Sequence, residues 1–182
     1  MSDDAPPAID PKALRRALGD FVTGVCVITA ALPDGTRLGM TVNSFASVSL
    51  DPPLVLFSVA NAASGIDGWR AATHYAINVL ADNQSAISNR FARAMTDKWE
   101  GLAPETGLTG APLIQGAVAH FECAAEHQVP GGDHTIFIGR VLAFDRPRPN
   151  ADPLVFHQGR YRDLTHQHDI AVPADALWLL GW

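Results

Sequence analysis

The sequence predicts a mainly β protein, in which an antiparallel sheet of six or seven strands closes into a barrel with a few flanking helices. Two observations carry this prediction: short apolar runs of strand length recur with turn residues between them, and few stretches show helical periodicity. Closure is expected because it removes the exposed edges of a sheet. The 182 residues suit a single domain, with a core at about residues 11–164 and a C-terminal tail at 165–182.

The first expected element is a short helix that starts at Pro11. Asp10 can cap its first turn, and proline is well suited to the first helical position. Apolar residues then recur at helical spacing: Leu14, Ala17, Leu18 and Phe21. The order of cap, proline and apolar stripe therefore predicts a helix ahead of the first strand.

A β-hairpin is expected next. Residues 25–29 are rich in β-branched side chains, Pro33-Asp34-Gly35 has the composition of a turn, and an extended run resumes at Arg37. Further runs have the length and composition of strands: residues 54–59, 75–80, 117–125, 135–144 and 154–156. A glycine turn at Gly159 is expected to end the last of them.

Two helical segments are expected among these strands. Residues 84–95 form the stronger one, because their apolar side chains repeat every fourth position and a cap is available just before them. The repeating residues are Ile87, Phe91 and Met95, and the candidate caps are Asp82 and Asn83. A weaker helical turn is expected at residues 66–72. The apolar segment 176–182 is expected to pack on the barrel or on a second subunit, which favours a homodimer.

Composition excludes several classes of protein. Hydrophobic residues make up 47% and charged residues 18% of the chain, and no apolar run approaches the roughly 20 residues of a membrane span, so we expect a soluble globular protein. The formal net charge of -6 disfavours nucleic acid as a partner. The first twelve residues are acidic and proline-rich, unlike a secretory signal, so the cytoplasm is the expected compartment.

The usual sequence signatures of catalysis are missing. No dinucleotide-binding glycine motif, P-loop, zincin motif or serine-hydrolase elbow occurs. Cys26 and Cys123 lie far apart in apolar runs, which predicts buried, reduced thiols. His166 and His168, with His157 nearby, lack the closed ligand set of a metal site, so no metal is expected.

Residues 38–64 form an unusual central stretch, in which small and hydroxylated residues alternate with apolar ones. The short polar or flexible residues are Gly39, Thr41, Asn43, Ser44, Ser47 and Ser49. They could present hydroxyls, an amide and closely approaching backbone to a flat polar ligand. The pattern alone equally fits an antiparallel strand whose Thr41, Ser47 and Ser49 face water, so this alternative stays open.

Three separated stretches resemble the flavin reductase-like family. They are residues 23–29 (TGVCVIT), residues 38–64 and residues 131–141 (GGDHTIFIGRV), and they occur in the family's order. The resemblance covers about residues 11–164. Members of this family are short flavin:NAD(P)H reductases that serve two-component flavin-dependent monooxygenases. Their fold is the FMN-binding split barrel, usually as a homodimer with flavin near the subunit interface.

The resemblance implies a set of flavin contacts from the central stretch and from two later side chains. The implied residues are Gly39, Met40, Thr41, Asn43, Ser44, Ser58, Val59, Ala60, Asn61, Ala63, Ser64, Phe91 and Lys98. The first five would lie along the isoalloxazine ring and ribityl chain, and residues 58–64 would approach the ribityl chain and phosphate. Phe91 would complete the pocket, and Lys98 would pair with phosphate. Many relatives carry an arginine or a second polar residue within 61–64, so the choice between FMN and FAD stays open.

The resemblance also implies a nicotinamide site at Gly132-Asp133-His134. Gly132 would permit close approach, Asp133 would fix the turn, and His134 would face the reacting rings, so Asp133 and His134 are the expected catalytic residues. Tyr161 is expected at the nicotinamide or adenine. The motif alone favours a hairpin turn at residues 131–133 with an incidental histidine at its rim. For Tyr161, packing in the core stays open as an equal alternative.

The expected function is hydride transfer from C4 of NADH or NADPH to N5 of FMN or FAD, with the reduced flavin passing to a partner monooxygenase. His134 would orient the nicotinamide as a hydrogen-bond donor. Two alternatives stay open on the same barrel: a non-catalytic flavin-binding or electron-carrier protein, and an oxidase of the pyridoxamine-phosphate type. The sequence does not identify the partner or its substrate.

Overall fold

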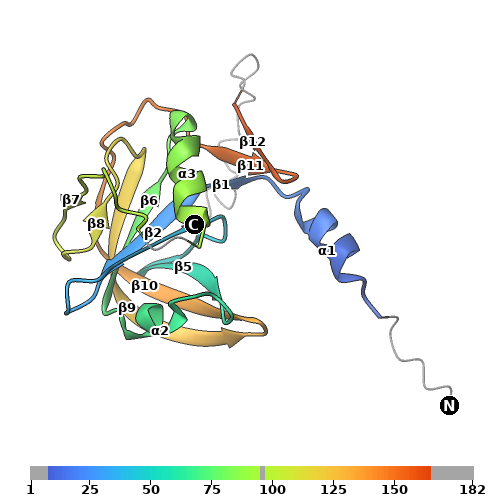
Figure 1. The fold of residues 1–182 in the computed structure, drawn as a ribbon, viewed down its shortest axis with the longest axis horizontal. Coiled ribbons are helices and arrows are strands. Elements are labelled where there is room, and N and C mark those ends of the chain that lie inside the picture. Colours follow the sequence, from blue (N-terminus) through green and yellow to red (C-terminus); the bar gives the residue numbers. More distant parts are fainter. Residues whose placement is uncertain (1–7, 95–96, 165–182) are drawn as a thin grey trace.

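The computed structural model describes residues 8–94 and 97–164, which form a β barrel with helices at its periphery (Figure 1). The helices are α1 (Pro11–Leu18), α2 (Ile66–Ala71) and α3 (Ser85–Ala92), the last preceded by a 3₁₀ turn at Asp82–Gln84. The longer strands are β2 (Cys26–Ala31), β3 (Arg37–Val42), β4 (Ala46–Leu50), β5 (Pro53–Ala60), β6 (His74–Val79), β9 (Ala119–Gly131) and β10 (His134–Asp145). The short strands are β1 (Thr23–Gly24), β7 (Glu105–Thr106), β8 (Pro112–Leu113), β11 (Val155–His157) and β12 (Arg160–Arg162).

Seven strands make one antiparallel sheet in the order β3-β2-β6-β9-β10-β5-β4. The two end strands, β3 and β4, follow each other in the chain and are joined by residues 43–45. Ser44 in this link accepts a hydrogen bond from the backbone N–H of Ser58 at 3.0 Å and donates to its carbonyl at 3.4 Å. The link thus ties the open side of the curled sheet to β5. The mainly β architecture expected from the sequence is confirmed.

Aromatic side chains fill the centre of the barrel. Phe57 stacks on Phe137 with ring centroids 5.2 Å apart, and Tyr75 meets Phe57 edge-on at the same distance. All three side chains are buried, because alternate residues of β5, β6 and β10 point inward. Cys26 and Cys123 are buried free thiols, as expected.

A buried polar network pins three segments together beside this core. The amide of Asn78 donates to the carbonyl of Val27 at 2.9 Å and accepts from the backbone N–H of Ile114 at 2.8 Å. Thr29 donates to the carbonyl of Pro112. Because these groups are buried and paired, they fix the position of the 112–114 segment against β2 and β6.

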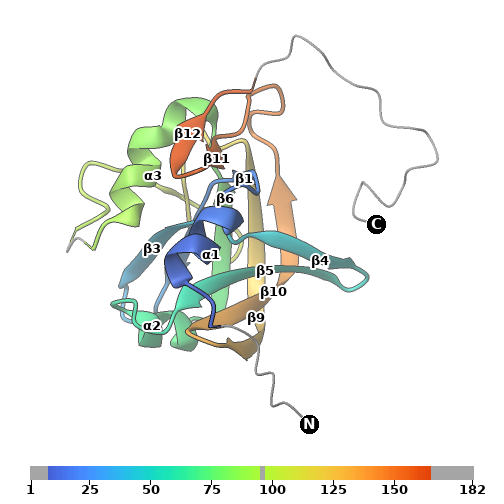
Figure 2. The same cartoon turned by 90° about the vertical axis from the view of Figure 1, so that its right-hand side faces the viewer.

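The N-terminal helix forms as expected but stands away from the barrel (Figure 1), and in the view turned by 90° it lies in front of the barrel (Figure 2). Asp10 accepts a hydrogen bond from the backbone N–H of Lys12 at 3.0 Å, and Pro11 occupies the first turn. No residue of α1 is buried within the described part of the chain, and Leu18 and Phe21 are 66% and 76% exposed. The apolar stripe that predicted the helix is therefore uncovered in a single protomer.

The strands β9 and β10 form a long hairpin that extends beyond the rest of the sheet. Strand β6 pairs with β9 only as far as Ala124, whereas β9 and β10 stay paired to Gly131 and His134. Gly132, with φ of 69°, and Asp133 form the two-residue loop. A positive φ at the first loop position alone is the mark of a type II′ turn, in which glycine is favoured.

Several details differ from the expectations. Neither Asp82 nor Asn83 caps α3: its cap residue is Gln84, which makes no capping bond, and the side chain of Gln84 instead accepts from the N–H of Ala81 at 3.0 Å. Strand β4 follows β3, in line with the alternative that placed Ser47 and Ser49 on a strand, and Ser47 is exposed. Met95, His166, His168 and the tail 165–182 lie outside the described residues. Within the described part, no helix is long and apolar enough to cross a membrane.

Candidate functional site

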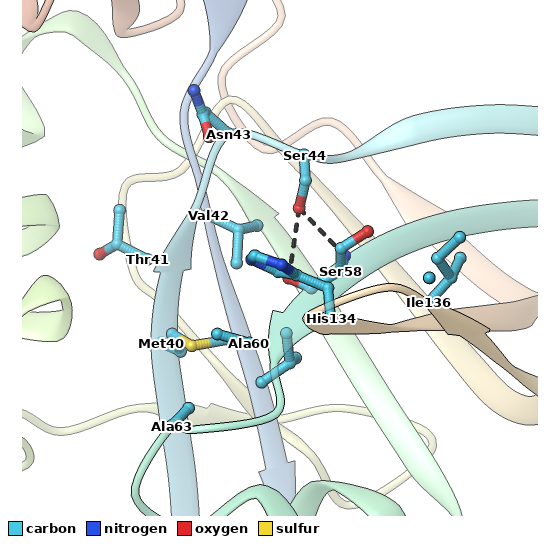
Figure 3. Close-up of a pocket in the computed structure, with 12 residues that line it drawn as sticks. Met40, Thr41, Val42, Asn43, Ser44, Ser58, Ala60, Ala63, His134 and Ile136 are labelled. Carbon is cyan, nitrogen blue, oxygen red and sulfur yellow. Dashed lines mark hydrogen bonds between the residues drawn. The ribbon is translucent and has the colours of Figure 1, made fainter. Parts of the chain in front are cut away.

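A cavity opens between β3 on one side and β5 and β10 on the other, and we call it the central cavity (Figure 3). Its volume is about 530 Å³, within the usual range for small-molecule sites. It is lined by Met40, Thr41, Val42, Asn43, Ser44, Ser58, Val59, Ala60, Ala63, Gly131, His134 and Ile136. Nine of these were expected at the flavin or nicotinamide; Val42, Gly131 and Ile136 were not.

Strand alternation explains how these residues reach the cavity. Along β5, Val55, Phe57 and Val59 are buried while Ser58 and Ala60 are only partly buried. Along β10, Phe137 enters the core while His134 and Ile136 line the cavity. One face of each strand thus builds the barrel core and the other faces the cavity.

His134 reaches the cavity from the first position of β10. Its Nδ1 lies 2.7 Å from a carboxylate oxygen of Asp133. A carboxylate only accepts, so Nδ1 carries the hydrogen and Nε2 is the nitrogen left for a ligand. In Figure 3 the imidazole is drawn between the β3 residues and Ile136.

The partner of His134 is a charged but exposed group. The hydrogen bond from His134, and then the charge of its ring, lower the pKa of the Asp133 carboxyl below its ordinary value. The Asp133 side chain is 94% exposed, so the pair contributes little to stability. Its effect is therefore local: it sets the tautomer and the orientation of one ring.

The free edge of β3 forms the opposite wall of the site. Trp99 Nε1 donates to the carbonyl of Arg37 at 3.1 Å, and Lys98 Nζ donates to that of Gly39 at 3.0 Å, so alternate backbone groups point away from β2. By the same alternation, the backbone N–H and C=O of Thr41 face this edge. A flat ligand with donors and acceptors along its rim can use such groups.

A smaller cavity of about 160 Å³, the side cavity, adjoins the central one. Gly39 and Ser64 line it, next to Met40 and Ala63 of the central cavity. Its remaining lining residues are Arg37, Leu38, Gly65, Trp69, Ala94, Lys98 and Trp99. Burial lowers the pKa of Lys98, whose Nζ also donates to the carbonyl of Phe91 at 2.9 Å. Two cationic side chains, those of Arg37 and Lys98, border this cavity.

Phe91 is buried and lines neither the central cavity nor the side cavity. Its ring packs edge-on against Trp99, with centroids 4.9 Å apart. A β-carbon at Gly39 would overlap the Phe91 ring, so Gly39 is required for strand and helix to approach. These two residues therefore support the wall of β3 from behind instead of lining the central cavity.

Tyr161 lines a third cavity of about 200 Å³ on the far side of Thr41, Val42 and Asn43. Its hydroxyl donates to Asn89 Oδ1 at 3.0 Å and lies 2.8 Å from Ser88 Oγ, from which it can accept, and these bonds tie β12 to α3. The third cavity shares three lining residues with the central cavity, so Tyr161 is close to the site but in a separate recess.

Asn61 and Gly132 are at the hairpin tip, outside the lining of these cavities. The side-chain amide of Asn61 donates to the carbonyl of Gly132 at 3.2 Å, and its backbone N–H donates to the carbonyl of Asp133 at 2.8 Å. The polar atoms that the sequence assigned to flavin thus bind the turn that carries His134.

A group of site residues escaped the sequence analysis. Arg37, Trp69 and Trp99 line the side cavity, and Ser88 and Phe156 line the third one. Arg37 and Trp99 are far apart in the chain and meet only at the free edge of β3. Trp99 directly follows Lys98, which was expected at the phosphate, so its position in the sequence could have marked it as a site residue. The sequence does not show, however, which strand Trp99 packs against.

Comparison with known proteins gives a consistent match. Residues 18–165 match the model of the flavin reductase like domain family. An FMN reductase (NADH) from Agrobacterium fabrum is 44% identical over 162 residues, which cover 89% of this chain and 91% of that protein. The reductase component of a flavin-dependent trigonelline monooxygenase from Acinetobacter baylyi is 47% identical over 133 residues, covering 73% of this chain and 43% of that protein.

Other relatives are also longer than this chain. A Rhizobium meliloti relative is 42% identical over 152 residues, which are 84% of this chain and 48% of that protein. The chain therefore spans about half the length of several relatives that it matches, and nearly all of the Agrobacterium enzyme.

A solved structure gives the same fold. The NADH:FAD oxidoreductase of Streptomyces globisporus, in complex with NAD and FAD fragments, superimposes with a TM-score of 0.82 at 41% identity, covering 90% of this chain and all of that one. This match confirms the split barrel expected from the sequence. Because the family model matches residues 18–165, which include all strands of the barrel, the chain belongs to the flavin reductase-like family.

Proposed function

We propose that this chain is an NAD(P)H-dependent flavin reductase that reduces FMN or FAD and supplies the reduced flavin to a partner monooxygenase. The observation that carries the proposal is the open central cavity, which has the free edge of β3 on one wall and His134 on the other. Relatives at 44% and 47% identity are an FMN reductase and a monooxygenase reductase component. Family membership alone does not fix activity, so the cavity matters.

The residues present fit a flavin. The wall at Thr41 offers backbone groups at a free strand edge, and Met40, Ala60 and Ala63 offer apolar surface for a flat ring. The adjoining side cavity brings Ser64, Lys98 and Arg37 within its lining, which suits a phosphate group. We therefore propose that the ring of the flavin occupies the central cavity and that its phosphate end turns toward Lys98.

Nicotinamide would then approach from the hairpin side. When bound together, the two ring systems themselves supply the hydride chemistry, from C4 of the nicotinamide to N5 of the flavin. The protein holds the rings in contact, which can contribute on the order of 7 to 11 kcal/mol to catalysis. His134 lines the cavity, and we propose that its Nε2 makes this orienting contact. Because Nδ1–H is bonded to Asp133, Nε2 of this tautomer is a hydrogen-bond acceptor and not the donor expected from the sequence.

The activity is tested by mixing the purified chain with NADH in air and following absorbance at 340 nm. We expect rapid NADH loss that depends on added flavin, and parallel runs with FMN, FAD and NADPH identify the preferred pair. A control without flavin sets the background rate. A yellow protein that leaves NADH untouched would instead favour a non-catalytic carrier.

We also propose that the chain acts as a homodimer, in the cytoplasm. Apolar side chains on α1, on β4 and on the far end of β10 are exposed, and solvent-exposed apolar groups on several elements are typical of an interface. These side chains are Leu14 and Leu18 on α1, Val48 and Leu50 on β4, and Leu142 and Phe144 on β10, together with Phe21 just after α1. The exposed stripe of α1 is the strongest support, because it lacks any cover within the described protomer.

A further inference from the structure

The hairpin tip that carries His134 has little support from the sheet. Beyond Ala124, strand β9 has no β6 neighbour, so among the described strands only β10 lies beside its outer end, and β10 in turn pairs with β5. The last pair between β10 and β5 is His134 with Ala60. The tip therefore depends on support from groups outside the sheet, among them the polar group that directly follows β5.

Asn61 is that group. Its backbone N–H donates to the carbonyl of Asp133 at 2.8 Å, and its side-chain amide donates to the carbonyl of Gly132 at 3.2 Å. Its Oδ1 accepts from the hydroxyl of Thr135 at 2.7 Å. Asn61 therefore holds both loop residues of the turn, and it holds the residue on each side of His134.

Arg70 extends this network to α2. Its Nη2 donates to Asn61 Oδ1 at 3.3 Å and to Thr135 Oγ1 at 3.4 Å, while its carbonyl accepts from Gln128 at 2.9 Å. Its Nη1 also pairs with Asp67 at 3.4 Å. Helix α2 is thereby bonded to both strands of the hairpin, on the side away from the central cavity.

We propose that Asn61, Arg70 and Thr135 form a latch that positions His134 for hydride transfer, and that Asn61 acts on the hairpin and not on the flavin. None of the three latch residues lines the central cavity, and the hydrogen bonds of their side chains go to one another, to Asp67 and to the hairpin, so they are positioning residues. This inference rests on the proposed reductase activity. Its physical basis is that a displacement of about 1 Å in a reacting pair can cost 10²-fold in rate.

The proposal is tested with Asn61→Ala by stopped-flow reduction of bound flavin under anaerobic conditions. We expect the limiting rate at saturating NADH to fall at least about tenfold, with the Kd of the flavin, from fluorescence quenching, changed less than about threefold. A raised Kd with an unchanged limiting rate would make Asn61 a flavin ligand and overturn the latch.

Thr135 provides a matched pair that preserves the fold. Thr135→Val removes the hydroxyl at constant shape, and Thr135→Ser keeps the hydroxyl. We expect the rate loss in the valine variant and near-complete rescue in the serine variant, and equal rates in the two would contradict the proposal. Arg140→Ala serves as the control, because Arg140 is an exposed arginine that pairs with Glu126 farther along the same hairpin.

Hydrogen exchange separates failure of the latch from failure of the proposed function. If the wild-type chain oxidises no NADH, the function fails, yet the latch still predicts faster amide exchange in a peptide spanning residues 126–138 of Asn61→Ala. Exchange equal to that of the wild type would overturn the latch whatever the activity. Faster exchange together with a lowered limiting rate supports both.

Discussion

His134 has one ring nitrogen bonded and one directed to the cavity. Asp133 accepts a hydrogen bond from Nδ1 at 2.7 Å, which leaves Nε2 without a partner among the described residues. In the proposed function, Nε2 is the contact for an incoming nicotinamide, oriented by the carboxylate of Asp133. The proposal thus assigns the catalytic contact to a single side chain at the start of β10.

Replacement of His134 by alanine should lower NADH oxidation at least about tenfold, because one positioned hydrogen-bond partner is lost. Flavin binding should stay within about threefold of the wild type, since the β3 wall is untouched. Steady-state assays at saturating flavin, with flavin titrations by fluorescence, measure both quantities. Turnover equal to that of the wild type would remove His134 from the catalytic residues.

At the level of single residues, the resemblance grouped residues correctly where they are close together in the chain. Met40 and Thr41 at the end of β3, and Asn43 and Ser44 in the link after it, line the same cavity. It predicted poorly where a side chain's direction depends on a distant partner. Asn61 is the example, because its amide could serve a ligand or a turn, and the choice depends on where residues 131–133 lie in space.

At the level of elements, the hairpin β9–β10 is longer than its sequence suggests. The prediction ended the first strand at residue 125, because a polar segment and Pro130 follow. Proline is excluded from central strands but accepted where an edge is free, and β9 has no β6 neighbour at this point. The hairpin could extend only because one of its edges faces away from the sheet, which local sequence cannot show.

The turn at the hairpin tip requires glycine at position 132. Any other residue at this position would have to keep the backbone φ of 69°, which costs about 1–2 kcal/mol for an L-residue with a β-carbon. Gly132→Ala should therefore lower the free energy of unfolding by about that amount in urea titrations, and lower NADH oxidation as well.

Gly24→Ala is the matched control for this change. Gly24 has open space at its β-carbon position, so its free energy of unfolding should change by less than about 0.5 kcal/mol. Equal effects of the two substitutions would show that the turn does not depend on the backbone conformation of Gly132.

At the level of the whole molecule, strand composition was enough to predict a mainly β barrel. Each predicted strand exists, because β-branched and aromatic runs bounded by turn residues have few other stable arrangements. Strand β4 stayed one of two alternatives, since its alternation of serine with apolar residues fits a ligand-binding segment as well as a strand, and its pairing with β5 contains a register shift. The order of the strands in the sheet was not predicted, because it depends on pairing between segments far apart in the chain.

A dimer should depend on the stripe of α1. Phe21→Glu, together with Leu18→Glu, should convert a species of about twice 19.4 kDa into a monomer in sedimentation equilibrium. Leu108→Glu is the control, because Leu108 is 73% exposed in the loop between β7 and β8. A wild-type chain that sediments as a monomer would exclude the proposed assembly.

The two thiols should make the fold sensitive to alkali. Burial raises the pKa of Cys26 from 9.0 to about 12, and burial, with the charge of Glu122, does the same for Cys123. Between pH 9.0 and about pH 12, a thiol of the unfolded chain loses its proton while the buried thiol of the folded chain keeps it. As the pH rises through this range, the free energy of unfolding should therefore fall by up to about 1.4 kcal/mol per pH unit for each thiol. Urea titrations from pH 8 to pH 11 measure this slope.

The same burial should keep both thiols unreactive in the native protein. A disulfide reagent at pH 8 should detect no fast-reacting thiol before unfolding and two afterwards, because the chain has two cysteines. A rapidly reacting thiol in the folded protein would show that one of the two is accessible.

The unpaired edge of β3 has a consequence for handling the protein. Trp99 and Lys98 donate to two of its carbonyls, but among the strands of residues 8–94 and 97–164 none lies beside the backbone of Thr41 on that side. An unpaired strand edge can form backbone hydrogen bonds with a strand of another polypeptide, and a small molecule bound along the edge blocks this pairing. Stocks kept without flavin should therefore become turbid sooner than stocks saturated with it, and light scattering during storage would record the difference.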